Sequence, residues 1–323
     1  MNGTSHTNVK KYDVLAVMDT NIDMIIKGGD IVPRFRQEEQ FVGDYVILMG
    51  GSAGIFLCQT AKLGLKTIGV GVVGDDAFGR IVIDTLKDSG VSTEYVKIDK
   101  TQKTGMGVAL CKEDDRAMLT YCGTNDAVIP EMITDELLND ARHLHIASYY
   151  LTKKMQKGYL DIVKRAKKYG MSVSIDTNFD PEQKWKGIHE LLPYTDIFMP
   201  NEQELLYISE RDNEPEAVQV LLQKCGIIVV KKGKSGAALY TKDKKIDVSI
   251  FETGKNVVDA IGAGDSFDGG FIYAYLKNMR MEQCLKTGVI CGGYNTTGMG
   301  GTAGQADWAT LQCIIDVDNS IKV

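Results

Sequence analysis

The sequence has little of what metal centres, disulfide scaffolds and membrane spans require. It contains 4 histidines and 7 cysteines in 323 residues, and no two cysteines form a C-x-x-C pair. The histidines do not pair at metal-ligand spacing, and an odd number of cysteines in mostly apolar surroundings is typical of free thiols in a reducing compartment. No apolar run reaches the roughly 18 residues that a membrane span needs, and the N-terminus lacks the hydrophobic stretch of a signal peptide. We therefore expect a cytoplasmic protein with no membrane partner.

Positive charge is scarce as well. The net charge is −6 and the pI is about 5.4, which does not fit the basic footprint of a nucleic-acid-binding domain. The richest basic run, "VKRAKKYG" at 163–170, is explained by a solvated helix that ends in positive residues. We expect no nucleic-acid partner. A chain of this length suits one large α/β domain or two smaller ones.

Short segments rich in Val and Ile alternate with helix-length segments along most of the chain. Strands are predicted at 11–19, 66–74, 143–148, 171–177, 196–200 and 226–232, and helices at 52–64, 76–90, 154–169 and 214–224. This alternation predicts an α/β fold with a doubly wound, mostly parallel central sheet that helices cover on both faces. We expect residues 1–10 to be a disordered tail and residues 11–323 to form a single domain.

Two segments break this alternation. Residues at about 22–49 and about 94–123 have no good helical period, and the second resembles a β-hairpin around the turn "KEDDR". We interpret both as excursions that pair into a small β-sheet lid over the main domain. Ordinary extra strands at the sheet edge are the alternative. An exposed lid sheet would benefit from cover by a second copy, so we expect a homodimer through the lid.

The run "GVGVVG" at 69–74 matches the G-x-G-x-x-G fingerprint of dinucleotide-binding folds. Asp75 and Asp76 follow at once, where a pyrophosphate would need to approach the helix amides. We therefore favour a tightly packed strand, with Asp76 capping the next helix, over a nicotinamide or flavin site. A nicotinamide oxidoreductase is the corresponding alternative function.

A second glycine-rich stretch, "DAIGAGDSFDGGF" at 259–271, carries the chemistry. It is predicted as a short strand at 256–259, a turn through Gly262 and Gly264, and a helix from Asp265. Small residues let backbone amides approach an anion, and the helix N-terminus adds partial positive charge. A carboxylate at that point would accept the proton of an incoming hydroxyl during phosphoryl transfer. For this stretch alone, helix capping by Asp265 is the alternative.

This stretch resembles the second signature of the ribokinase-like (PfkB-type) carbohydrate kinases. The segment "GGSAGIFLCQTAKLGLKTIGVGVVGDDAFG" from Gly50 is similar to the first signature, and "MDTNID" at 18–23 is similar to the substrate motif of the first strand. "PNEQE" at 200–204 matches the N-x-x-E element, and "VVKKGKSGAAL" at 229–239 looks like the strand and turn that line the nucleotide. The resemblance implies an ATP-dependent kinase that phosphorylates a primary hydroxyl of a small sugar or sugar-like substrate.

The resemblance also implies a role for individual residues. Asp265 would be the base, and the amides of Gly262, Ala263 and Gly264 would stabilise charge on the transferred phosphoryl group. Asn21, Asp23, Gly50 and Gly51 would bind the substrate; Asn201, Glu204, Lys232, Gly233 and Gly236 would bind ATP; Asn201 and Glu204 would organise Mg²⁺ indirectly; and Asp259 would lie at a candidate monovalent-cation site for K⁺. For Asn201 and Glu204 a helix-start capping box is the alternative.

Two positions depart from the family pattern. Ile55 replaces an asparagine that helps to shape the sugar pocket, and Ala260 replaces a Thr, Ser, Pro or Val in the second signature. The sequence therefore does not name the sugar. A nucleoside kinase of the same fold and a non-catalytic sugar or nucleotide sensor remain as alternatives.

Overall fold

The computed structural model describes residues 10–29, 31–112 and 115–317. Its larger sheet runs mostly parallel, with antiparallel pairing only where β12 meets β11 and β13. In order across this sheet the strands are β13 (Lys245–Val248), β12 (Ala237–Tyr240), β11 (Ile227–Lys231), β10 (Ile197–Phe198), β9 (Ser172–Ile175), β8 (Ala141–Ile146), β1 (Tyr12–Val17), β4 (Thr67–Gly74) and β5 (Ser92–Asp99). Of the expected tail at residues 1–10, residues 1–9 lie outside the described residues, whereas the Lys10 ammonium donates a hydrogen bond to the Tyr169 carbonyl at 3.0 Å.

The strand sequences are apolar on both sides, because helices cover both faces of this sheet. In β1, Val14 and Ala16 belong to one apolar core, whereas Leu15 and Val17 belong to the other, as the two-residue repeat of a strand requires. The helices that cover the first core are α1 (Ser52–Lys62), α2 (Ala77–Asp88), α8 (Ala263–Leu276), α9 (Met281–Asn295) and α10 (Trp308–Val317). Those that cover the second are α3 (Asp135–Asn139), α4 (Lys153–Lys168), α5 (Ile188–Leu191), α6 (Glu202–Ser209) and α7 (Glu214–Leu221). The predicted doubly wound sheet is confirmed.

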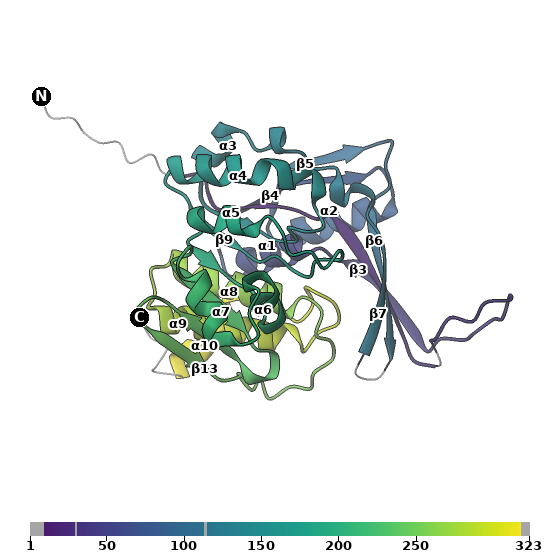
Figure 1. The fold of residues 1–323 in the computed structure, drawn as a ribbon. Helices are drawn as coiled ribbons and strands as arrows, with labels where there is room; N and C mark the ends of the chain where they lie inside the picture. Colours follow the sequence, from purple (N-terminus) through teal and green to yellow (C-terminus); the bar gives the residue numbers. More distant parts are fainter. Residues whose placement is uncertain (1–9, 30, 113–114, 318–323) are drawn as a thin grey trace, which may run out of the picture.

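A smaller sheet is separate from the larger one. Its strands, in order, are β3 (Asp44–Met49), β2 (Asn21–Lys27), β6 (Gly105–Lys112) and β7 (Asp115–Tyr121). In Figure 1 its strands extend away from the body of the molecule on the right. The second predicted excursion differs in its start, because β5 pairs in parallel with β4 in the larger sheet. Tyr95 and Val96 of β5 pack on opposite cores, so the excursion begins after Asp99.

The strand predicted at 256–259 does not form. Val257 and Val258 are 73% and 46% exposed, and this segment pairs with none of the described strands. The backbone amides of Val258 and Asp259 instead both donate to the carbonyl of Thr296, at 2.8 and 3.2 Å. β-branched residues favoured a strand here, but a strand needs a partner edge that the fold does not offer at this place.

The "GVGVVG" run is a packed strand, as predicted. β4 is buried along its whole length, and a Cβ at Gly69 would lie 2.4 Å from the Met18 sulfur. Asp76 caps α2 by accepting a hydrogen bond from the Gly79 amide at 2.7 Å. Among the described residues, no helix combines the length and apolar character that crossing a bilayer requires.

Candidate active site

A cavity of about 510 Å³ opens where the parallel strands end and the smaller sheet begins. This is the edge of an open α/β sheet at which ligands bind. The cavity collects the following predicted residues: Asn21, Asp23, Gly51, Asn201, Glu204, Gly233, Gly262, Gly264 and Asp265. It also collects polar residues that the sequence analysis did not single out: Asp19, Ser52, Asn125, Ser148, Asp176, Asn178 and Lys231. Chain segments far apart in the sequence therefore meet at one site.

The N-terminus of α8 opens onto this cavity. Gly262 is the N-cap with φ +72°, and a Cβ there would lie 2.7 Å from the Gly301 Cα. Within the described chain no side chain caps this helix end, which leaves its first amides available to an anion. Asp265 lies inside the first turn and does not cap the helix, so the capping alternative is wrong.

Asp265 is buried, with 8% of its surface exposed. Burial raises the pKa of its carboxyl to about 7, with a further upward contribution from the nearby Asp176 charge, while Lys231 and a hydrogen bond from Ser52 oppose the shift. A carboxyl with this pKa exchanges a proton readily near neutral pH, as a general base must.

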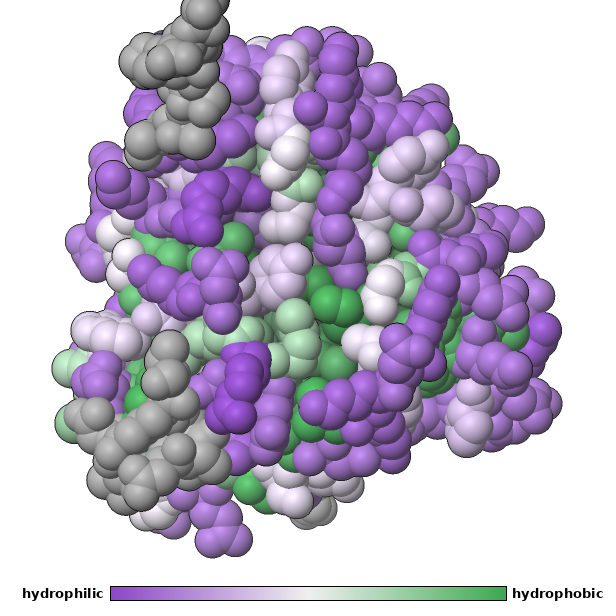
Figure 2. All heavy atoms as spheres, turned by 90° about the vertical axis from the view of Figure 1, so that its left-hand side faces the viewer, coloured by the Kyte–Doolittle hydropathy of each residue, from purple (hydrophilic) through white to green (hydrophobic). Residues whose placement is uncertain are grey.

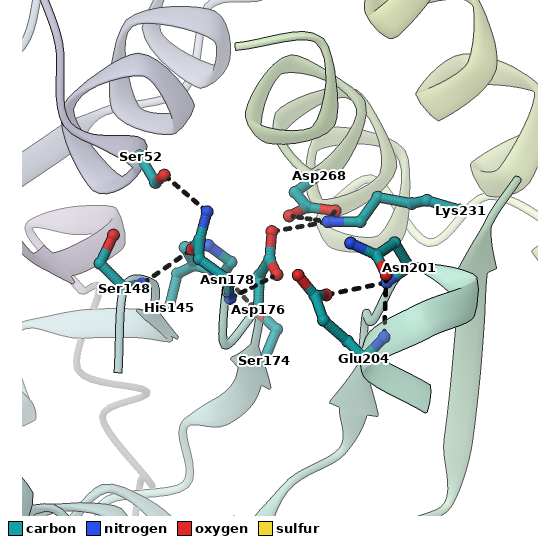
Figure 3. A network of polar contacts seen from close by, with 10 residues as sticks. All are labelled: Ser52, His145, Ser148, Ser174, Asp176, Asn178, Asn201, Glu204, Lys231 and Asp268. Carbon is teal, nitrogen blue, oxygen red and sulfur yellow. Dashed lines mark hydrogen bonds and ion pairs between the residues drawn. The ribbon is translucent and has the colours of Figure 1, made fainter. Parts of the chain in front are cut away.

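Next to Asp265 lies a buried charge network, shown in Figure 3. The Lys231 ammonium lies 2.5 Å from a carboxylate oxygen of Asp176 and 3.2 Å from one of Asp268. Burial works against the lysine charge, but Asp176 and Asp268 more than offset this and raise the Lys231 pKa. Burial and the Asp176 charge keep the Asp268 pKa well above its usual range. The network thus places one cation among several carboxyls.

Asn201 and Glu204 form a capping box at the start of α6. The Glu204 amide donates to Asn201 Oδ1 and the Asn201 amide donates to Glu204 Oε2, both at 2.9 Å. The capping alternative is therefore confirmed, yet both side chains also line the cavity. Burial, followed by the Asp176 charge, raises the Glu204 pKa to about 7.

Two glycines directly before α1 make room for polar residues that line the cavity. A Cβ at Gly50 would lie 2.5 Å from both Asn21 Nδ2 and Asp23 Oδ2, and one at Gly51 would lie 1.9 Å from the Asp19 carbonyl oxygen. Gly51 also has φ +86°, which disfavours other residues. Asn21 Nδ2 donates to Asp23 Oδ1 at 3.1 Å. Asn21 and Asp23 are therefore held as one polar unit on β2.

Asp19 and Asn178 are cavity residues that the sequence analysis did not predict. Asp19 accepts hydrogen bonds from the Ser52 amide at 3.1 Å and the Ser148 hydroxyl at 2.6 Å. Asn178 donates to the Ser52 hydroxyl at 2.8 Å and accepts from the Ser148 amide at 2.9 Å. Asp19 lies two residues after the buried strand β1, and Asn178 lies three residues after the buried strand β9. Polar residues at the carboxyl end of a parallel strand were the signal that could have found them.

Several predicted residues do not line the cavity. Lys232 forms an ion pair with Glu214 at 2.7 Å, and Gly236, with φ +89°, turns the chain between β11 and β12. The Asp259 carboxylate accepts from the amides of Ile261 and Gly300, each at 3.1 Å. Gly50 and Ala263 flank cavity residues without lining it themselves.

The fold and the site define the class of protein, and comparison with known proteins then identifies the family. The fold and an uncapped helix N-terminus beside a buried carboxyl define the class, an α/β phosphotransferase. A model described as pfkB family carbohydrate kinase matches residues 12–308. The chain belongs to this family. The predicted carbohydrate-kinase function is confirmed, and the nucleoside-kinase alternative is not favoured.

Relatives and solved structures agree with this assignment. An uncharacterized sugar kinase of Archaeoglobus fulgidus is 30% identical over 230 residues, which cover 71% of this chain and 90% of that one. Fructokinase-2 of Zea mays is 27% identical over 292 residues, covering 84% and 87%. The solved structure of Arabidopsis thaliana ribokinase, complexed with ribose and ATP, is similar in fold with a TM-score of 0.81 at 24% identity, covering 94% and 98%.

Proposed function

We propose that this chain transfers the γ-phosphoryl group of ATP to a primary hydroxyl of a small sugar, with Asp265 as the general base. The observation that carries the proposal is the position of Asp265: a buried carboxyl in the first turn of a helix whose N-terminal amides are capped by no side chain of the described residues. The oxygen of the sugar hydroxyl and the γ-phosphoryl group of ATP would meet between Asp265 and these amides.

The chain's own groups account for the proton and the charge. Asp265 removes the proton of the sugar hydroxyl as the oxygen forms its bond to the γ-phosphorus and the bond to the bridging oxygen breaks, which leaves ADP. The amides of Gly262, Ala263 and Gly264 stabilise the charge on the phosphoryl oxygens. Asn21, Asp23, Gly50 and Gly51 orient the sugar. The lid role of the smaller sheet is part of the proposal, since a lid over the cavity would keep water from competing as the acceptor.

Asn201 and Glu204 fit an indirect Mg²⁺ site. Their hard oxygen donors suit a cation that keeps several waters, and the described residues include no group of three or more ligating side chains that would hold a metal directly. Mg²⁺ supplies charge neutralisation of the phosphate oxygens. For the nucleotide, a Cβ at Gly233 would meet no atom within 4 Å, so the turn between Lys232 and Gly236 offers an open surface.

A K⁺ site at Asp259 is also part of the proposal. The carboxylate already accepts two backbone amides. A cation would therefore be bound by backbone carbonyls of this loop.

We also propose a cytoplasmic homodimer that forms through the lid. The seven cysteines, all within the described residues, are free, as expected in a reducing compartment. On the smaller sheet Tyr45 is 65% exposed, Leu119 61% and Tyr121 49%, and such apolar exposure marks interaction surfaces. The opposite face of the molecule is mostly hydrophilic, with small apolar areas between polar residues (Figure 2).

An ADP-release screen tests the proposed function. The protein is incubated with ATP, Mg²⁺ and a panel of ketohexoses, pentoses, sugar acids, sugar phosphates and nucleosides. We expect ADP release with a sugar from the wild type and almost none from Asp265→Asn. Sugar and nucleotide binding without any ADP release would favour the sensor alternative. Oligomeric state by sedimentation, for wild type and Leu119→Glu, tests the dimer.

A further inference from the structure

A buried asparagine at the edge of the cavity has a side-chain oxygen without a hydrogen-bond partner among the described residues. Asn125 lies in the short 3₁₀ turn η1 (Gly123–Asp126) that follows β7, and it is 3% exposed. The oxygen without a partner among the described residues is its Oδ1. Asn125 is also one of the residues that line the cavity. A buried amide oxygen without a partner is unfavourable by about 1–3 kcal/mol, and the residue that carries it borders the cavity, where a bound ligand would offer hydrogen-bonding groups to the Asn125 amide.

The strand beneath Asn125 is built to accommodate it. A Cβ at Gly105 would lie 2.6 Å from Asn125 Oδ1, and a Cβ at Gly107 would lie 2.7 Å from Asp23 Oδ1. Two residues apart on β6, these glycines face the same side of the sheet. Any larger residue would displace one of the two polar side chains. Because Gly105 and Gly107 have no side chains, Asn125 and Asp23 have space above β6.

This arrangement brings Asn125 next to the predicted substrate residues. Asn21 pairs with Gly105 and Asp23 pairs with Gly107 in the register of β2 and β6. Asn125 thus lies beside Asn21, across Gly105, and the two amides and the carboxylate border the same cavity. We propose that Asn125 is a further substrate-binding residue, whose amide hydrogen-bonds a non-reacting hydroxyl of the sugar. This inference rests on the proposed function.

The chemistry of the surroundings indicates the part of the substrate that binds here. An amide offers both an acceptor and donors, which match a hydroxyl that donates and accepts. Ile55, Met118 and Leu151 line the same cavity and present an apolar surface to carbon. We therefore infer a hydroxyl-bearing, uncharged end of the sugar, with one carbon-rich side turned toward these residues.

Asn125→Leu tests the inference, because it keeps a similar volume and removes every hydrogen bond. Thr124→Val is the matched control: Thr124 is the neighbouring residue, is fully buried, and has a hydroxyl without a partner, but it does not line the cavity. The dissociation constant for sugar is measured by calorimetry for D-ribose, D-fructose and their monodeoxy analogues. Kinetic constants follow for the sugar that the wild type binds best. Asn125→Ala replaces the leucine variant if the latter does not fold.

We expect Asn125→Leu to weaken sugar binding by about ten- to a hundredfold, as one unmade hydrogen bond in a buried site predicts. The KM of Asn125→Leu for ATP should stay within about twofold of the wild-type value. The dissociation constant of Thr124→Val for the sugar should also stay within about twofold of wild type. For one monodeoxy analogue, which lacks the hydroxyl that Asn125 binds, wild type and Asn125→Leu should bind equally.

Two results would overturn the inference. The first is equal sugar affinity of wild type and Asn125→Leu. The second is a loss of affinity in Asn125→Leu that is the same for the sugar and for every monodeoxy analogue, which would indicate a purely structural role. Failure of the proposed function looks different. In that case the wild type binds sugar, and loses the binding in Asn125→Leu, yet releases no ADP.

Discussion

Replacing Asp265 by asparagine should remove catalysis and at the same time stabilise the protein. The loss of turnover follows from the loss of the base, on the order of 10²–10⁴-fold. The gain in stability follows from burial, which raises the Asp265 pKa from its ordinary 3.8 to about 7. That shift is about three pKa units, and at about 1.4 kcal/mol per unit it corresponds to about 4 kcal/mol of unfavourable buried charge.

The sign and pH range of this effect follow from proton linkage. Between pH 3.8 and about 7 the unfolded chain has released the Asp265 proton while the folded chain keeps it, so wild-type stability falls as the pH rises through this window. Asparagine does not titrate. The stability of Asp265→Asn relative to wild type should therefore grow between pH 4 and pH 7 and level off above it.

Urea denaturation of both proteins at several pH values measures this difference directly. Asp307→Asn serves as a control of opposite sign, because hydrogen bonds from Thr310 lower the Asp307 pKa and the charge there stabilises the fold. A relative stability of Asp265→Asn that is flat from pH 4 to 8, or near-normal turnover, would refute the reasoning. Each protein's unfolding free energy in water is extrapolated with its own slope against urea concentration, so that a difference in slope is not mistaken for a difference in stability.

Three further predictions follow from the same geometry. The acidic limb of kcat/KM should have an apparent pKa near 7, since Asp265 must be ionised, and a pH–rate profile with the limb near 4 would contradict this. Lys231→Met should lose about 3–5 kcal/mol in urea denaturation, because it leaves Asp176 buried without its partner, and Lys231→Met combined with Asp176→Asn should recover part of this loss. Gly51→Ala should lose far more stability than Gly64→Ala. Both glycines have positive φ, but only at Gly51 would a Cβ lie 1.9 Å from another atom. Equal losses would show that the backbone strain of a positive φ, and not the steric clash, determines the cost.

Local patterns predicted much of the fold and part of the site. The parallel sheet followed from Val- and Ile-rich segments between helices, and the glycine turn that leads into α8 followed from Gly262, Gly264 and Asp265, which are neighbours in the chain. Prediction was wrong where a contact between distant segments decided the outcome. Val257 and Val258 have strand-forming side chains, but the amides of Val258 and Asp259 donate to the carbonyl of Thr296, just beyond the end of α9.

The sequence by itself determined the alternation of strands and helices over most of the chain, the glycine turn, and the carboxyl that follows it, because periodicity and turn chemistry depend on nearby residues. Only the tertiary structure decided which residues surround that carboxyl. Asp176, Lys231 and Asp268 come from three separate segments, and Asn125 reaches the cavity only because β6 lies beside β2. Burial then sets the pKa of Asp265, since desolvation depends on what covers a group in space and not on its neighbours in the chain.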